Sequence, residues 1–214
     1  MNWPDALIRE LAERRCCVFL GAGASAGSLS QDGKTRPPTW EGFLVGLSEK
    51  MNTAAEKTTA EELIAEKKYL EAAEIIYADI TPPDFSQYIR DTLVAPRFQP
   101  SPVHESVLQI DPKIVITTNY DDIYDTYCRT GDAADGYNVS RYYDSHLVSD
   151  LRSPVRLIVK AHGCISDAAK IVLTRSSYFE QRRAFENFFK SLTQFFCTAA
   201  FCLLAIVFQT QIFN

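Results

Sequence analysis

C-C-V-F-L-G-A-G-A-S-A-G, residues 16–27, is the stretch that decides the fold. Its first five residues, 16–20, form an apolar run of strand length, and the glycines that follow favour a strand over a helix. Small residues at the end of a strand let the backbone approach a ligand closely, with N–H groups directed outward, which suits a pyrophosphate. A Gly-x-Gly taken alone is equally typical of a tight turn between a strand and a helix, so the rest of the chain has to decide.

The composition indicates one acidic globular domain. The chain has 214 residues, of which 46% are hydrophobic and 23% charged, and its net charge is −5. A chain of this length can bury a sizeable core, and its acidic balance argues against a broad nucleic-acid-binding surface. The start M-N-W-P-D lacks the basic and apolar regions of a signal peptide, which favours the cytoplasm. The apolar stretch 195–208 is short for a bilayer, so we expect no membrane association.

The cysteine pattern gives no sign of a metal site. Six cysteines are present, and no two of them form a C-x-x-C pair; they are residues 16, 17, 128, 164, 197 and 202. Neither a zinc ribbon nor a thioredoxin-like site is therefore indicated. We expect reduced, buried thiols.

Predicted strands alternate with predicted helices. Strands are expected at 16–20, 113–117, 155–160 and 170–174, with a short one near 139–143. Helices are expected at 5–15, through most of 40–110, at 121–129 and at 177–196, and T-A-E-E (59–62) fits a capping box that opens one of them. The strands are apolar without alternation, which is typical of strands covered by helices on both faces. The sequence therefore predicts an α/β fold with a parallel sheet.

Polar residues follow three of the predicted strands. Ser25 lies in the turn after 16–20, Asn119 and Asp121 follow 113–117, and His162 follows 155–160. The carboxyl ends of parallel strands meet at one edge of a sheet, where ligands bind in such folds, so we expect these side chains to converge. Each also has a plainer interpretation: Asn119 and Asp121 can cap the next helix, and His162 can be a turn histidine.

The remaining candidate residues are interpreted as structural. We expect His104 on the surface of a helix over 102–108, and Trp40 in the core. G-K-T (33–35) is similar to the end of a P-loop, but that motif needs a glycine at position 28, where this chain has serine. A nucleoside-triphosphate hydrolase is therefore disfavoured.

In their order, the motifs resemble the SIR2-like domain, the prokaryotic branch of the sirtuin fold, many of whose members act in anti-phage defence. The matching motifs are G-A-G-A-S (21–25), P-T-W (38–40), T-T-N-Y-D (117–121), K-A-H-G (160–163) and I-V-L-T-R-S-S-Y (171–178). The resemblance extends from residue 16 to about residue 196. It implies a single domain, residues 1–214, with a Rossmann-like parallel sheet and a helical insertion at about 40–110.

The same resemblance implies NAD as the ligand. By position, Asn119 and His162 would be the catalytic pair, and the residues that bind NAD would be Gly21, Ala22, Gly23, Ser25, Thr118 and Asp121. Members of the defence branch hydrolyse NAD at the nicotinamide–ribose bond, so the implied activity is that of an NAD hydrolase. The resemblance also suggests a homo-oligomer or a partner protein of a defence system.

Two alternative functions stay open at this point. One is a non-catalytic module that senses NAD or ADP-ribose. The other is an NAD-dependent protein deacylase, which is disfavoured because sirtuin deacylases carry a zinc module of two C-x-x-C pairs and this chain has none. No zinc is therefore expected.

Residues 199–214 depart from the family pattern. Family members continue with a strand and a motif like G-Y-S-L-S-D-P-D, which contacts the adenosine side of NAD, and this chain has no such motif. With one choice of synonymous codons, Leu203 to Asn214 reads V-G-Y-S-L-S-D-P-D-I-Q in a shifted frame. Our hypothesis is a change of reading frame near 198–200, which would leave the domain truncated and its C-terminal strand region incomplete.

Overall fold

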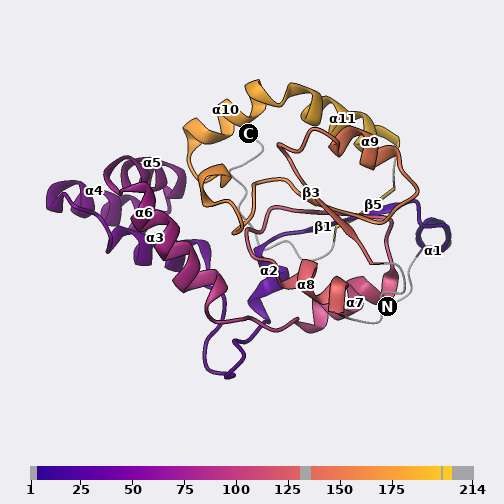
Figure 1. The fold of residues 1–214 in the computed structure, drawn as a ribbon, viewed down its shortest axis with the longest axis horizontal. Helices are drawn as coiled ribbons and strands as arrows, with labels where there is room; N and C mark the ends of the chain where they lie inside the picture. Colours follow the sequence, from indigo (N-terminus) through magenta and orange to yellow (C-terminus); the bar gives the residue numbers. More distant parts are fainter. Residues whose placement is uncertain (1–3, 131–135, 199, 204–214) are drawn as a thin grey trace.

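A five-stranded parallel sheet with the strand order β3-β4-β2-β1-β5 forms the centre of the molecule. The computed structural model describes residues 4–130, 136–198 and 200–203. The strands are β1 Cys16–Leu20, β2 Ile114–Thr117, β3 Asn138–Arg141, β4 Leu157–Lys160 and β5 Ala200–Leu203. Helices lie on both sides of the sheet (Figure 1), which confirms the predicted α/β fold with a Rossmann-like parallel sheet.

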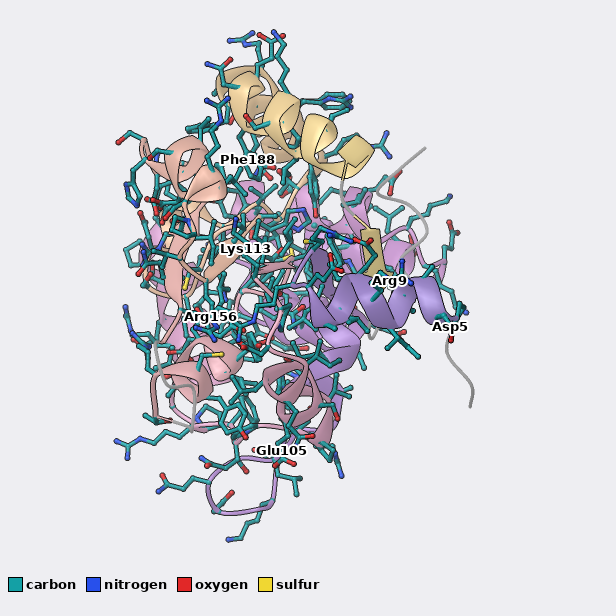
Figure 2. All side chains as sticks on the ribbon, turned by 90° about the vertical axis from the view of Figure 1, so that its right-hand side faces the viewer. Asp5, Arg9, Glu105, Lys113, Arg156 and Phe188 are labelled. Atoms are coloured by element: carbon teal, nitrogen blue, oxygen red, sulfur yellow. The ribbon has the colours of Figure 1, made fainter. Side chains whose placement is uncertain are left out.

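Each face of the sheet packs on its own set of helices. On β2, Ile114 and Ile116 join a cluster with residues of α9 (Leu147–Arg152) and α11 (Glu186–Thr198), among them Phe188, which is labelled in Figure 2. Val115, between them, joins the opposite cluster, which includes residues of α2 (Ala22–Ala26), α7 (Pro102–Ile110) and α8 (Ile123–Thr130). This period of two is why the strands are apolar throughout.

The first helix, α1 (Asp5–Ala12), lies at the surface. It has no buried residue, and Figure 2 shows Asp5 and Arg9 on its outer side. Because none of its residues is buried, α1 adds little to the core. No helix of the described residues is long and apolar enough to cross a membrane.

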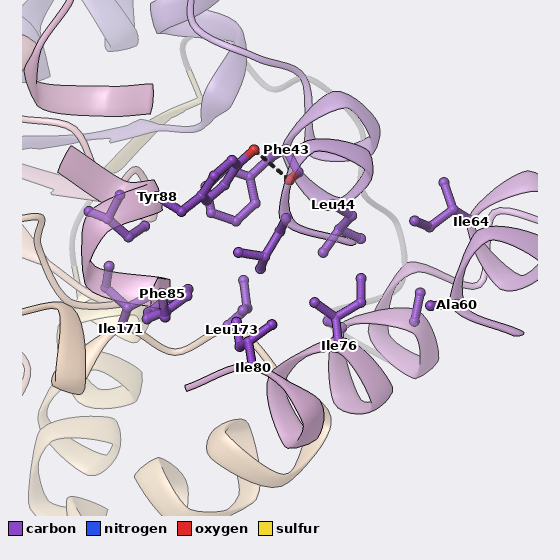
Figure 3. Packing of buried hydrophobic residues seen from close by; sticks show 14 of the residues in the cluster. Phe43, Leu44, Ala60, Ile64, Ile76, Ile80, Phe85, Tyr88, Ile171 and Leu173 are labelled. Atoms are coloured by element: carbon purple, nitrogen blue, oxygen red, sulfur yellow. Dashed lines mark hydrogen bonds between the residues drawn. The ribbon is translucent and has the colours of Figure 1, made fainter. Parts of the chain in front are cut away.

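The helical insertion forms a second core beside the sheet (Figures 1 and 3). Its elements are α3 Trp40–Ser48, α4 Ala54–Ala65, α5 Tyr69–Asp79, α6 Pro82–Ile89 and a π-helical turn, η1 Arg90–Val94. The Tyr88 hydroxyl donates to the Phe43 carbonyl at 2.8 Å. Gly46 leaves room for this tyrosine, because a Cβ there would lie 2.4 Å from the hydroxyl oxygen. The last helix of the stretch 40–110, α7, packs under the sheet instead, through Val107.

The strand predicted at 170–174 is wrong. A short 3-10 turn, η2 Ala168–Lys170, leads into an extended segment that pairs with no strand of the described residues, and α10 starts at Arg175. Within this segment the Val172 N–H donates to the His162 carbonyl at 3.0 Å. Ile171 and Leu173 pack into the insertion core, whereas Val172 packs against the sheet. The apolar pattern therefore arises from burial between two cores and not from strand pairing.

Two helix boundaries also differ from the prediction. The helix expected to open with a capping box at 59–62 begins at Ala54, and the Thr59 hydroxyl donates to the Ala55 carbonyl inside it. The helix predicted at 177–196 is two helices, α10 (Arg175–Ala184) and α11, which meet at Phe185. α10 begins with a capping box that Thr174 and Ser177 form.

The C-terminal segment supplies the edge strand. β5 pairs in parallel with β1, so that Ala200 is opposite Cys16 and Leu203 opposite Phe19. The reading-frame hypothesis concerns residue 199 and residues 204–214 as well, and these lie outside the described part of the chain.

Candidate functional site

A pocket of about 130 Å³ opens at the carboxyl ends of β1, β2 and β4, next to the insertion. The lining residues from the sheet side are Ala22, Ser25, Thr118, Asn119, Tyr120, Asp121, His162 and Tyr178. Those from the loop before α3 and from the insertion are Pro37, Pro38, Thr39, Trp40, Phe43 and Leu93. The pocket thus has one polar side and one largely apolar side.

The Gly-rich turn contributes the first polar residue. Gly21 follows β1 in extended backbone and caps α2, in which Ser25 is buried. Ala22 and Ser25 line the pocket, whereas Gly21 takes part through its carbonyl and Gly23 is not among the lining residues.

Asn119, Ser25 and Asp121 form one hydrogen-bonded group. Asn119 Nδ2 donates to Ser25 Oγ at 3.1 Å and to the Gly21 carbonyl at 3.1 Å. Ser25 Oγ in turn donates to Asp121 Oδ2 at 2.9 Å. Because both amide hydrogens of Asn119 are engaged, its Oδ1 is the atom left to accept a hydrogen bond from a ligand hydroxyl or water. Asp121 also caps α8, since its Oδ1 accepts from the Ile123 N–H at 3.2 Å.

His162 reaches the same pocket from the end of β4. Its ring lies edge-on to Tyr178 of α10, with centroids 5.0 Å apart and Nδ1 3.4 Å from the tyrosine hydroxyl. Burial lowers the pKa of His162 from 6.5 to about 4, so the ring is neutral at pH 7. Gly163 follows with φ +88°, and a Cβ there would lie 2.4 Å from the Lys170 carbonyl oxygen. Only glycine therefore lets the chain turn directly after the histidine.

Aromatic rings form the other side of the pocket. Trp40 stacks on Phe43 at 5.8 Å, and Tyr120 lies 6.4 Å from Phe43. Trp40 was expected in the core; it is half-buried and packs on the insertion core while it also lines the pocket. Tyr120 is fixed by a 2.7 Å hydrogen bond from its hydroxyl to the Val172 carbonyl.

A charged cluster lies behind the polar side of the pocket. Lys160, the last residue of β4, is 1% exposed, and its Nζ lies 3.4 Å from Asp125 Oδ2 and donates to the Asp121 carbonyl. Burial by itself would lower the pKa of Lys160, but the nearby Asp125, Cys164 and Asp121 outweigh it, and the net direction is upward. The lysine is therefore charged at neutral pH.

His104 does not lie on the helix surface, as the sequence suggested, but is 1% exposed. Its Nδ1 accepts from the Ser101 N–H at 3.0 Å in a capping box at the start of α7. Ser101 Oγ donates to the Ala24 carbonyl at 2.7 Å, which ties α7 to the turn that carries Ser25. Burial lowers the pKa of His104, against the opposing effects of Asp121 and Asp125, so this histidine is a neutral structural group.

The predicted site residues therefore come together, with one exception. Ala22, Ser25, Thr118, Asn119, Asp121 and His162 line one pocket, Gly21 is hydrogen-bonded to it, and Gly23 stands apart. The sequence did not single out Lys160, Asp125, Tyr178 or Phe43. For Lys160 a signal existed, because a charged residue that ends an otherwise apolar buried strand needs a partner. Within the described residues, no group of three or more histidine, cysteine or acidic side chains is placed to hold a metal ion.

Comparison with known proteins supports one family. Residues 113–214 match the family model described as SIR2-like domain. The match covers β2, β4 and α10, with Asn119, Asp121, His162 and Tyr178, and it does not include the Gly-rich turn or the insertion. SIR2-like domains generally bind NAD, so the match indicates a function related to NAD. None of the curated proteins that were compared matches the chain.

Proposed function

We propose that this protein binds NAD in the pocket and hydrolyses its nicotinamide–ribose bond. The observation that carries the proposal is the meeting of Asn119 and His162, from the ends of two different strands, in one pocket. A volume of about 130 Å³ is below the roughly 300–1,000 Å³ of typical small-molecule pockets. It therefore encloses part of a dinucleotide, and we assign that part to the end that reacts.

The reaction needs little from the protein besides positioning. The bond from ribose C1′ to the nicotinamide nitrogen breaks with its electron pair leaving on nicotinamide, and positive charge develops on the ribose. A water oxygen then bonds to C1′, and its proton leaves to a base or to solvent. Asn119 Oδ1 accepts from a ribose hydroxyl or from that water, and neutral His162 accepts from the water.

The other lining residues have supporting roles in this proposal. The turn that holds Gly21, Ala22, Gly23 and Ser25 lies beside the pyrophosphate. Thr118 and Asp121 bind on the ribose side, where a carboxylate favours developing positive charge. The aromatic side of the pocket excludes water from the reacting carbon.

Nicotinamide release tests the proposal directly. We expect the parent chain to release nicotinamide and ADP-ribose from NAD, and His162→Ala and Asn119→Ala to be slower by about 10²-fold or more. His146→Ala is the matched control, because His146 is an exposed histidine that lies 3.5 Å from Asp150 in a loop away from the pocket. A parent chain that leaves NAD intact, or a His162→Ala variant as fast as His146→Ala, would falsify the assignment.

A non-catalytic sensor of NAD or ADP-ribose is the second candidate. One observation favours it: a histidine whose pKa is about 4 is a weak proton acceptor at neutral pH. Calorimetry with NAD and with ADP-ribose measures binding, and the nicotinamide assay measures hydrolysis. A sensor binds either nucleotide without releasing nicotinamide, so the two measurements together separate the candidates.

A role in anti-phage defence is a further part of the proposal, and it rests on the family resemblance alone. In a cell that carries the gene, we expect the NAD concentration to fall after phage infection, and to stay level when Asn119 is replaced by alanine. A fall of equal size in both cells would assign the loss of NAD to another protein.

A further inference from the structure

Lys160 is a charged residue in the most buried part of the sheet. It ends β4 between β2 and β3, opposite Thr117 on one side and Arg141 on the other. Its side chain is 1% exposed, and the three strand residues before it are apolar. Burying an ammonium group is costly unless partners compensate it, so its contacts have to explain its presence.

Both partners of Lys160 lie on the segment that follows β2. The ammonium group donates to the Asp121 carbonyl, and it lies 3.4 Å from Asp125 Oδ2 in α8. The second oxygen of that carboxylate, Asp125 Oδ1, is buried without a hydrogen-bond partner among the described residues. The ion pair is thus incompletely satisfied, which is a poor arrangement if stability were its only purpose.

Two hydrogen bonds connect Asp121 to the residue that we place on the substrate. Asp121 Oδ2 accepts from Ser25 Oγ at 2.9 Å, and Ser25 Oγ accepts from Asn119 Nδ2 at 3.1 Å. The Asp121 backbone therefore sets where its carboxylate lies, the carboxylate orients Ser25, and Ser25 orients the amide of Asn119. A shift of the Asp121 carbonyl would be passed to Asn119 Oδ1.

We propose that Lys160 is a positioning residue, whose bond to the Asp121 carbonyl holds Asp121, Ser25 and Asn119 in the geometry that binds the ribose side of NAD. This inference rests on the proposed function. The inference gives the two contacts of Lys160 different roles. The contact with the Asp121 carbonyl positions the site, and the contact with Asp125 compensates the buried charge.

The test compares one single and one double variant. Lys160→Met removes the ammonium group and leaves Asp125 buried and unpaired, so we expect a loss of both stability and activity. Lys160→Met/Asp125→Leu replaces the pair with apolar side chains of similar volume, so we expect stability to return to near the parent's. Its kcat for nicotinamide release should stay lower by about tenfold or more, with a smaller change in KM.

Arg156→Met is the matched control. Arg156, which is labelled in Figure 2, directly precedes β4, at the opposite end of the strand from Lys160. Its Nε donates to Asp111 Oδ1 at 2.5 Å. Loss of this ion pair should lower stability and leave kcat unchanged. If Lys160→Met/Asp125→Leu does not fold, Asp125→Asn takes its place, because it keeps the carbonyl contact of Lys160 and should retain kcat within about twofold.

A second readout keeps the inference separate from the proposed function. The NMR signals of the Asn119 side-chain amide, assigned through Asn119→Ser, report its hydrogen bonds without any NAD. We expect them to shift in Lys160→Met/Asp125→Leu and to stay in place in Arg156→Met and Asp125→Asn. A parent chain that does not process NAD would contradict the proposed function, and the NMR comparison would still test the role of Lys160. Two results would overturn the role of Lys160. One is a folded double variant whose Asn119 amide signals and kcat match those of the parent chain. The other is a folded Asp125→Asn variant in which the amide signals shift and kcat falls.

Discussion

His162 owes its chemistry to its neighbours. Its ring is held against Tyr178 at the end of β4, and burial lowers its pKa to about 4. Burial also raises the pKa of Tyr178, so the tyrosine remains a neutral hydroxyl beside the ring. The histidine is therefore in its neutral form over the whole physiological range of pH.

This shifted pKa predicts an unusual pH profile. A group that works in its neutral form loses activity as the pH falls through its pKa, so kcat/KM for NAD should be level from about pH 5 upward and fall towards pH 4. A normal histidine would give the fall near 6.5. The profile, together with an NMR titration of the His162 ring, checks this; an inflection near 6.5 in both would show that the site is more hydrated than the structure indicates.

The lowered pKa of His162 also predicts that the folded protein loses stability as the pH falls. The unfolded chain binds a proton to this histidine near pH 6.5, whereas the folded chain binds it only near pH 4. The contribution of His162 to stability is therefore complete above about 6.5 and declines as the pH falls towards 4.

Sequence motifs identified the residues at the surface of the pocket better than those behind it. Asn119 and His162 stand beside turn residues at strand ends, which is a local pattern. Lys160 and His104 depend on partners that are distant in sequence, since Lys160 lies 3.4 Å from Asp125 and the His104 ring stacks on Tyr124 at 5.9 Å. For Lys160 the apolar strand indicates that a partner is needed, but the sequence does not show which residue that partner is.

At the level of elements, the insertion and the sheet share the extended segment before α10. Leu173 is 1% exposed and belongs to the insertion core, the same cluster as Phe43, which lines the pocket. We therefore expect Leu173, a residue outside the insertion, to help hold the aromatic side of the pocket in place.

Leu173→Ala should loosen this contact. We expect the free energy of unfolding to fall by about 2–5 kcal/mol, as for other buried leucines, and KM for NAD to rise by about three- to tenfold. Leu192→Ala is the control, since Leu192 is 7% exposed and packs on the sheet face covered by α9 and α11. Denaturation and kinetics measure both effects; an equal KM in the two variants would show that the insertion is held without Leu173.

The strand prediction for residues 170–174 failed because these residues are buried between two cores and not within the sheet. Residues 170–174 have the composition of a strand, yet Ile171 and Leu173 face one core and Val172 the other. Hydrophobic patterns record burial, and burial between two cores produces the same pattern as a buried strand. The capping signal at Thr59 failed for a related reason, since a continuous helix from Ala54 satisfies the same backbone groups internally.

At the scale of the whole molecule, the C-terminal segment carries an open prediction. β5 completes the sheet beside β1, and the family match extends from residue 113 to residue 214. We expect the nucleotide sequence of the gene to encode V-G-Y-S-L-S-D-P-D in a shifted frame over the codons of residues 203–214. Codons that cannot give this motif would end the hypothesis.

A chain with the restored frame offers a functional check of the same hypothesis. Because the restored motif is expected to contact the adenosine side of NAD, this chain should bind NAD more tightly than the present one. Calorimetry on the two chains measures the difference, and equal affinities would show that the motif is not needed for binding.

By itself, the sequence determined the parallel α/β sheet, the helical stretch between its first two strands, and the polar residues at three strand ends. These features are local, because they depend on hydrophobic periodicity and on the residues that a turn permits. Only the tertiary structure decided that Trp40 and Phe43 lie over those strand ends, that residues 170–174 form no strand, and that Lys160 lies behind Asp121. These features depend on which distant segments pack together, and packing is a property of the whole chain.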